Sequence, residues 1–167
     1  SRGLGDVYKR QAELMGEEND YLARYEAMKE TVNRVAWDGE WYARATMDDG
    51  RFLGVKREPM AKIWLNAQTW AVLSGMAPAQ RAHQAMDSVR RYLNTPLGIK
   101  KIDPAMADYP TPEDPLTYYN KGCGENGSVF CHANAWAVIA ECLLGRGERA
   151  WEYYSQLLPM NAQANAG

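Results

Sequence analysis

Two stretches of this chain repeat one pattern: Leu65-Asn66-Ala67-Gln68-Thr69-Trp70-Ala71-Val72-Leu73 and Cys131-His132-Ala133-Asn134-Ala135-Trp136-Ala137-Val138-Ile139. Trp70 matches Trp136, and Gln68 matches Asn134. Each stretch has the pattern of an apolar helix, followed by a Gly-containing turn and an amphipathic helix. Repetition of a helical hairpin indicates stacked pairs, either a solenoid or a closed α/α toroid. The sequence therefore predicts a mainly α fold.

Apolar spacing places the other elements around these two hairpins. We expect helices over residues 19–35, 63–75, 78–93, 131–144 and 148–158. A short β-hairpin is expected near 42–55, with its turn at Asp48-Asp49-Gly50. Residues 94–127 are rich in Pro, Gly, Tyr and Asp and are predicted to form one long loop. Long loops inside compact folds are often functional.

Polar side chains stand at matching places near the starts of the two apolar helices. They are Asn66, Gln68, His132 and Asn134. In a toroid the starts of the inner helices line a central cleft, so the matching offsets favour a pocket over a simple core. The Gly-bearing loop 125–130 delivers His132 to what we expect to be a buried helix start, where free backbone N–H groups attract anions. From the residues alone, a core His132 hydrogen-bonded to a neighbouring loop is equally compatible.

Bulk composition excludes several classes of function. The net charge is −2 and there is no basic stripe, so we expect no nucleic-acid partner. No apolar run has the length needed to span a bilayer, so we expect no membrane association. The three cysteines (Cys123, Cys131 and Cys142) lack metal-site spacing, and we expect reduced thiols, no metal site and a cytoplasmic protein.

The first eleven residues have the sequence of a translated sequencing adapter, Ser1-Arg2-Gly3-Leu4-Gly5-Asp6-Val7-Tyr8-Lys9-Arg10-Gln11. We interpret residues 1–11 as a disordered segment of this origin, with a disordered natural N-terminus as the alternative. Residues 12–167 are then the natural part of the chain.

Four blocks of sequence resemble the cellobiose and cellodextrin phosphorylases. The blocks are 36–42 with Arg44, 63–75, 81–93 with Gly98-Ile99, and 125–158. The cellobiose and cellodextrin phosphorylases are bacterial inverting glycoside phosphorylases whose catalytic domain is an (α/α)6 barrel. The resemblance spans nearly all of residues 12–167 and implies part of such a barrel, truncated at both ends. A partial barrel leaves inner helices uncovered, so we expect exposed apolar surface and marginal folding in isolation.

The resemblance implies the reaction as well. The family breaks a β-glucosidic bond of cellobiose or cellodextrin type with inorganic phosphate and releases α-glucose 1-phosphate with inversion. Phosphate is the co-substrate, a β-linked gluco-oligosaccharide is the partner, no cofactor is implied, and a homodimer is expected. The family's general acid is an Asp in an upstream motif that this sequence lacks, so we expect no catalytic residue here and no activity from the chain alone.

The resemblance carries two of the family's site residues over to this chain. His132 corresponds to a phosphate ligand, and Tyr119 to an aromatic residue of the acceptor site. Glu125 and Asn126 are further candidates for substrate binding, with Gln68 and Arg44 as possible additions; we also expect Arg44 to pair with the carboxylates of the 36–42 block. Pro115 and Gly124 replace a Glu and a Lys of the cellobiose phosphorylases, which leaves the acceptor sugar and the linkage open.

Two other functions remain compatible with the sequence. One is a glycoside hydrolase on the same toroid, with Glu125 as a base. The other is a non-catalytic helical-repeat binding module. Since the same domain also ends much larger cyclic-glucan synthases, the resemblance leaves the length of the parent chain open.

Overall fold

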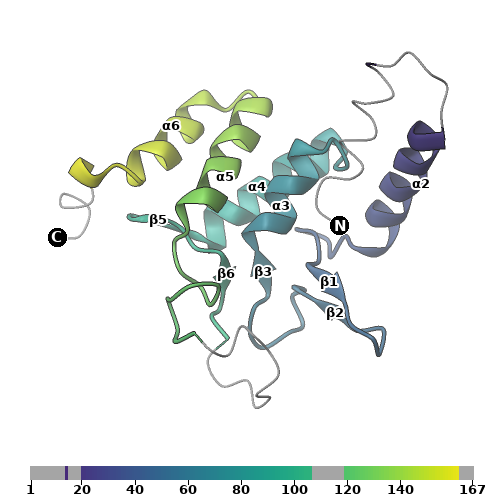
Figure 1. The fold of residues 1–167 in the computed structure, drawn as a ribbon, viewed down its shortest axis with the longest axis horizontal. Coiled ribbons are helices and arrows are strands. Elements are labelled where there is room, and N and C mark those ends of the chain that lie inside the picture. Colours follow the sequence, from purple (N-terminus) through teal and green to yellow (C-terminus); the bar gives the residue numbers. More distant parts are fainter. Residues whose placement is uncertain (1–13, 15–19, 107–118, 162–167) are drawn as a thin grey trace.

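Helices are the main secondary structure of the molecule. The computed structural model describes Leu14 and residues 20–106 and 119–161 (Figure 1). Its elements follow the order α2 (Asp20–Val35), β1 (Ala45–Thr46), β2 (Phe52–Leu53), β3 (Ile63–Trp64), α3 (Leu65–Leu73), α4 (Ala79–Tyr92), β4 (Asn94–Thr95), β5 (Gly98–Ile99), β6 (Ile102–Asp103), α5 (Cys131–Leu143) and α6 (Gly147–Gln156). The predicted mainly α class is confirmed. Residues 1–11 lie outside the described part of the chain.

The two helical hairpins predicted from the repeat are α3 with α4 and α5 with α6. The helices α3 and α5 pack against each other, and both begin at the end of the molecule where the short strands lie (Figure 1). Each is followed by a glycine with positive φ two residues after its last residue, at 71° for Gly75 and 72° for Gly145. Glycine adopts this left-handed conformation without a Cβ penalty, which turns the chain sharply into the next helix. The repeat is therefore structural as well as sequential.

The main core lies between these four helices. It is formed by Trp41, Ile63, Leu65, Val72, Ala82, Met86, Val89, Leu93, Ile99, Ala133, Ala137, Ala140 and Tyr153. Helix α5 contributes the small side chains of Ala133, Ala137 and Ala140 to this core, which leaves room for the neighbouring helices to approach. Helix α4 presents its apolar stripe to them at three- and four-residue steps, as its amphipathic sequence predicts.

The start of the first inner helix differs from the prediction. Ile63 and Trp64 form β3, which pairs antiparallel with β6 so that Ile63 lies opposite Asp103 and Trp64 opposite Ile102. The helix begins only at Leu65, whose N–H donates to the Lys101 carbonyl at 2.9 Å. A short apolar run fits a buried strand as well as a helix, and the distant partner β6 decides between them.

The segment 94–127 is more ordered than the predicted loop. Three short strands lie within it, because Asn94–Thr95 pairs with Gly98–Ile99 and Ile102–Asp103 pairs with β3. Residues 107–118, including Pro115, lie outside the described residues. The hairpin predicted near 42–55 is confirmed, with Ala45 opposite Leu53.

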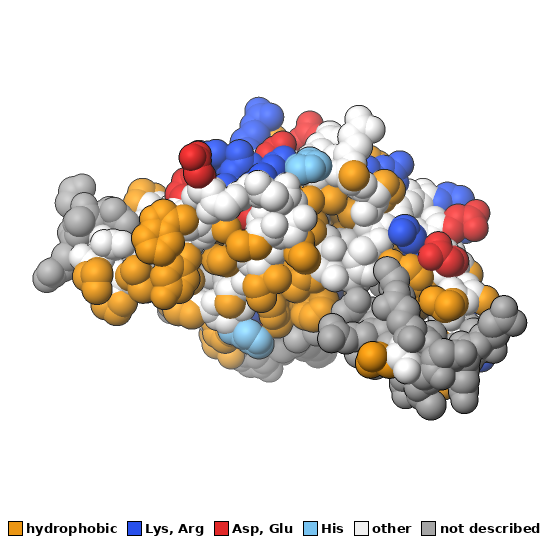
Figure 2. Space-filling view, turned by 90° about the horizontal axis from the view of Figure 1, so that it is seen from above, with side chains coloured by type: hydrophobic (Ala, Val, Ile, Leu, Met, Phe, Trp, Pro, Cys, Tyr) orange, Lys and Arg blue, Asp and Glu red, His pale blue; other side chains and the backbone are white. Residues whose placement is uncertain are grey.

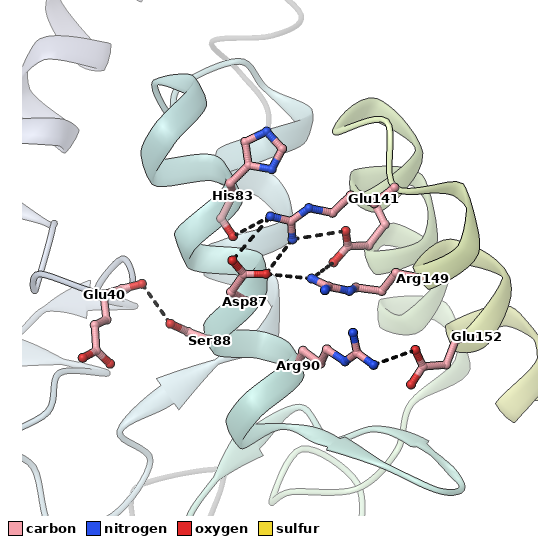
Figure 3. Close-up of polar contacts among 9 residues, drawn as sticks. Glu40, His83, Asp87, Ser88, Arg90, Glu141, Arg149 and Glu152 are labelled. Atoms are coloured by element: carbon pink, nitrogen blue, oxygen red, sulfur yellow. Dashed lines mark hydrogen bonds and ion pairs between the residues drawn. The ribbon is translucent and has the colours of Figure 1, made fainter.

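A charged cluster joins α4 of the first hairpin to α5 and α6 of the second (Figure 3). Asp87 of α4 forms ion pairs with Arg146 and Arg149, each at 2.7 Å, and the same two guanidinium groups lie 3.7 and 3.9 Å from the carboxylate of Glu141. Glu141 is fully buried, and burial raises the pKa of its carboxyl despite the two arginines. Burial also acts on Asp87, but hydrogen bonds from Arg149 and Arg146 outweigh it and hold the pKa of Asp87 below its usual value.

Helices α5 and α6 expose large apolar side chains. Ile139, Leu143, Trp151 and Tyr154 are exposed by 48%, 62%, 65% and 48%. Figure 2 shows hydrophobic side chains spread over much of the face seen there. The predicted exposed apolar surface is thus confirmed. None of the described helices combines the length and the hydrophobicity that crossing a bilayer requires.

Candidate functional site

His132 lies in the first turn of α5 and is exposed to solvent. Its ring packs 4.4 Å from the ring of Trp136, one helical turn later, and 6.4 Å from the ring of Phe130. The expectation of a buried helix start is wrong for this chain, because Phe130, Cys131 and His132 are all exposed. The first backbone N–H groups of a helix have no partner within the helix, so an anion approaching the imidazole also meets these donors.

An aromatic contact continues from His132 toward the other hairpin. Trp136 meets Trp70 edge to face, with ring centroids 5.3 Å apart. These are the two tryptophans that the repeat aligns, so α3 and α5 touch through equivalent positions. Such a pair contributes about 0.5–1.5 kcal/mol beyond its buried area. The contact fixes the indole against which the His132 ring rests.

The loop before α5 is organised by Asn126. This side chain is fully buried; its Oδ1 accepts the N–H of Met106 at 2.6 Å, and its Nδ2 donates to the carbonyls of Met106 and Tyr119, the latter at 2.9 Å. Its backbone N–H donates to the Cys123 carbonyl at 2.9 Å. Predicted as a substrate contact, Asn126 has the observed role of holding the loop that carries Tyr119 and Glu125.

Tyr119 lies over the turn at Gly124. Its side chain is 46% exposed, and a Cβ placed on Gly124 would come within 2.5 Å of Cδ1 of the ring. Gly124 has a φ of +50°. The Tyr119 ring can occupy this position only because Gly124 has no Cβ. An exposed aromatic ring held in this way suits the apolar face of a sugar.

Glu125 is partly exposed to solvent and is held by a buried lysine. Its carboxylate pairs with the Lys101 ammonium, with side-chain exposures of 43% for Glu125 and 7% for Lys101. The ammonium also lies 4.8 Å from the centre of the Phe130 ring. Sequence reasoning missed Lys101, since nothing in the pair Lys100-Lys101 indicates which of the two is buried.

Gln68 and Asn134 serve the backbone rather than a pocket. Gln68 accepts the Tyr42 N–H at 2.8 Å and donates to the Tyr42 carbonyl at 2.9 Å, and Asn134 does the same for Ile99 at 2.7 and 2.9 Å. Each also donates at 3.0 Å to the carbonyl four residues earlier. Both side chains are fully buried. The polar atoms of both amides satisfy backbone groups in the core, and a contact of Gln68 with substrate stays a prediction.

Arg44 lies apart from His132, and its expected carboxylate partners have another cation. Glu40 pairs with the Lys56 ammonium at 3.1 Å, and Asp38 accepts the Lys56 backbone N–H at 2.6 Å. The Arg44 guanidinium lies 5.5 Å from the Trp64 ring and lines a cavity of about 380 Å³ between α2, the β1–β2 hairpin and α3. His132, Glu125 and Tyr119 all lie on the segment 119–132 that leads into α5, whereas Gln68 lies on α3 and Arg44 lies just before β1.

Within residues 20–106 and 119–161, no three His, Cys, Asp or Glu side chains gather as metal ligands would.

Residues 4–166 match the profile of the catalytic domain of the glycosyl hydrolase 94 superfamily. This chain belongs to that superfamily. The resemblance seen in the sequence is thereby confirmed at the level of the family.

Three relatives illustrate the range of the superfamily. The chain is 39% identical over 135 residues to a solabiose phosphorylase of Paenibacillus borealis, covering 81% of this chain and 18% of that protein. It is 39% identical over 146 residues to an N,N'-diacetylchitobiose phosphorylase of Vibrio furnissii, covering 84% and 18%. It is 32% identical over 147 residues to a cellobionic acid phosphorylase of Neurospora crassa, covering 85% and 19%. The chain thus spans about a fifth of the length of these relatives.

Proposed function

We propose that this chain forms the phosphate and acceptor side of the active site of an inverting glycoside phosphorylase. The observation that carries the proposal is the exposed imidazole of His132 at the start of α5, on the same segment as Glu125 and Tyr119. An imidazole and the free N–H groups of a first helical turn together bind a phosphate dianion. The names of the relatives above, which are phosphorylases of three different disaccharides, support this choice of reaction.

The chemistry needs little from this part of the enzyme beyond positioning. A phosphate oxygen attacks the anomeric carbon, the glycosidic C–O bond breaks with inversion, and the leaving oxygen takes a proton from a general acid. In this proposal the general acid comes from another part of the domain. His132 holds the attacking phosphate, which is already a nucleophile and requires no base.

Tyr119 and Glu125 contact the leaving sugar in this proposal. The Tyr119 ring stacks on the sugar, and the Glu125 carboxylate accepts hydrogen bonds from its hydroxyl groups. The proposed substrate class is a β-linked gluco-disaccharide or a short cello-oligosaccharide. Asn126 acts indirectly, because its carboxamide holds the loop on which both side chains stand.

A chimaeric phosphorylase tests the proposal. In it, this chain replaces the matching segment of the Paenibacillus borealis solabiose phosphorylase. We expect phosphate-dependent release of sugar 1-phosphate from at least one of solabiose, cellobiose, cellobionic acid, N,N'-diacetylchitobiose and cello-oligosaccharides. His132→Ala should lower kcat/KM for phosphate by about a hundredfold, the effect of losing a charge-assisted contact in the transition state.

The chain offers a matched control in its other histidine. His83 lies on α4, and its carbonyl accepts a hydrogen bond from Arg146 at 3.4 Å, so His83→Ala leaves this backbone contact in place. We expect His83→Ala to retain full activity. A folded chimaera that releases free sugar without phosphate would support a hydrolase instead, and a folded chimaera without any turnover would contradict the proposal.

A further inference from the structure

Lys101 has an unusual environment for a lysine. Its side chain is only 7% exposed, although an ammonium group removed from water is costly unless it is paired. Two partners compensate for this cost: the Glu125 carboxylate and the face of the Phe130 ring, whose centre is 4.8 Å from Nζ. The ion pair is asymmetric, since the carboxylate remains 43% exposed. Lys101 is therefore the buried partner that fixes the ion pair, and the Glu125 carboxylate is the partner that stays accessible from solvent.

The backbone of Lys101 is anchored as firmly as its side chain. Its N–H donates to the Ser128 carbonyl and its carbonyl accepts the Leu65 N–H, both at 2.9 Å. Ser128 belongs to the loop that leads into α5, and Leu65 begins α3. Lys101 thus links the starts of the two inner helices. A side chain held by Lys101 keeps a fixed position relative to both.

We propose that Lys101 is a positioning residue that fixes the Glu125 carboxylate as a hydrogen-bond acceptor for the leaving sugar. This inference rests on the proposed function and deepens it. The buried ammonium holds one carboxylate oxygen of Glu125. The other oxygen is available to the hydroxyl groups of a sugar stacked on Tyr119. Lys101 acts through Glu125 and does not contact phosphate.

The test is a double-mutant cycle in the chimaeric phosphorylase, run in the synthetic direction from sugar 1-phosphate and acceptor. Lys101→Met keeps the apolar stem and removes the charge, and Glu125→Gln keeps the shape and removes the charge. We expect each to raise the acceptor KM about tenfold, the effect of one charge-assisted hydrogen bond. The KM for sugar 1-phosphate should stay unchanged. The double variant should be no worse than either single one, because both changes remove the same contact.

Lys100 provides a matched control. It is the neighbouring residue, and its ammonium pairs with Asp103 with side-chain exposures of 30% and 33%. Lys100→Met should leave the acceptor KM unchanged. Lys101→Arg, which keeps the positive charge, should bring the acceptor KM back to within about threefold of the unmodified chimaera. This rescue distinguishes positioning from a general loss of stability, which thermal unfolding of each variant monitors.

Three results would overturn the inference. A raised KM for sugar 1-phosphate in Lys101→Met, additive with Glu125→Gln, would make Lys101 an anion ligand in its own right. Equal behaviour of Lys100→Met and Lys101→Met would leave Lys101 without a specific role. An unchanged acceptor KM in Glu125→Gln would remove the group through which Lys101 is said to act. Failure of the proposed function is separate, because it shows as loss of phosphate dependence in the unmodified chimaera.

Discussion

Gln68 and Asn134 occupy the same place in the two hairpins and form the same set of hydrogen bonds. Each carboxamide grips both backbone groups of one residue in a preceding segment, Tyr42 for Gln68 and Ile99 for Asn134. The side chains differ by one methylene, and the segments that they hold differ entirely in sequence. In both hairpins, therefore, a carboxamide near the start of the inner helix hydrogen-bonds to the backbone of a segment that precedes the helix.

Replacing Asn134 by leucine should destabilise the chain strongly. The substitution keeps a similar volume but leaves the buried N–H and C=O of Ile99 without these partners. Each such group costs about 1–3 kcal/mol, so we expect a loss of about 2–4 kcal/mol in the free energy of unfolding. Urea unfolding of the variant measures the loss. Gln80→Leu, at an exposed position of α4, is the control and should change stability by less than about 0.5 kcal/mol. A loss below about 1 kcal/mol for Asn134→Leu would contradict this account.

The charged cluster of Figure 3 predicts a pH dependence of stability. Burial raises the pKa of Glu141 above its ordinary value of 4.5, so the folded protein binds this proton more tightly than the unfolded chain does. The stability that follows is present below the unfolded pKa and is lost as the pH rises through the folded pKa. Glu141→Gln removes this loss. Its stability relative to the unmodified chain should therefore improve as the pH rises through this window.

Asp87→Asn provides the control of opposite sign. The pKa of Asp87 is held low, so its contribution is present above the unfolded pKa and is lost as the pH falls. Its removal should cost stability at neutral pH and progressively less in acid. Thermal unfolding of both variants between about pH 2 and pH 8 measures the two trends, since the Asp87 contribution is lost below its ordinary pKa and the Glu141 contribution above its own. Parallel pH profiles for Glu141→Gln and the unmodified chain would show that Glu141 titrates normally in the folded state.

The exposed apolar side chains of α5 and α6 predict self-association of the isolated chain. Leu143 and Trp151 are exposed by 62% and 65%, and contiguous apolar surface of this kind drives association in water. Leu143→Gln with Trp151→Gln should lower the association constant by about tenfold or more, since each side chain contributes about 1.5–3 kcal/mol when buried. Analytical ultracentrifugation at several concentrations measures it. Association as strong as in the unmodified chain would place the contact on another face.

The helices were predictable because their apolar positions recur locally. The strand at Ile63 and Trp64 was not predictable, because its partner Ile102 lies far along the chain and no local signal marks the pairing.

The candidate site was also only partly predictable from the sequence. Polar residues at matching helix starts were visible in the sequence, but a carboxamide that grips the backbone and one that grips a ligand have the same sequence signature. The His132 side chain is exposed and the Asn134 side chain is buried, and only the three-dimensional structure shows this difference.

Gly124 offers a test of Tyr119 that does not alter the tyrosine. Alanine at Gly124 would place a Cβ 2.5 Å from Cδ1 of the Tyr119 ring, so the ring must leave its position. Gly122→Ala is the matched control, because its φ of +79° is also left-handed but a Cβ there meets nothing within 4 Å. The backbone strain of about 1–2 kcal/mol is therefore common to both variants.

The difference in acceptor KM between these two variants therefore reports the contribution of the Tyr119 ring alone. In the chimaeric phosphorylase we expect Gly124→Ala to raise the acceptor KM about tenfold over Gly122→Ala, which corresponds to the loss of about 1.4 kcal/mol of stacking. The KM for sugar 1-phosphate should be the same in both, because His132 and the start of α5 are untouched. Equal acceptor KM values would show that the ring over Gly124 does not contact the sugar. An unequal KM for sugar 1-phosphate would show instead that the loop and the phosphate site move together.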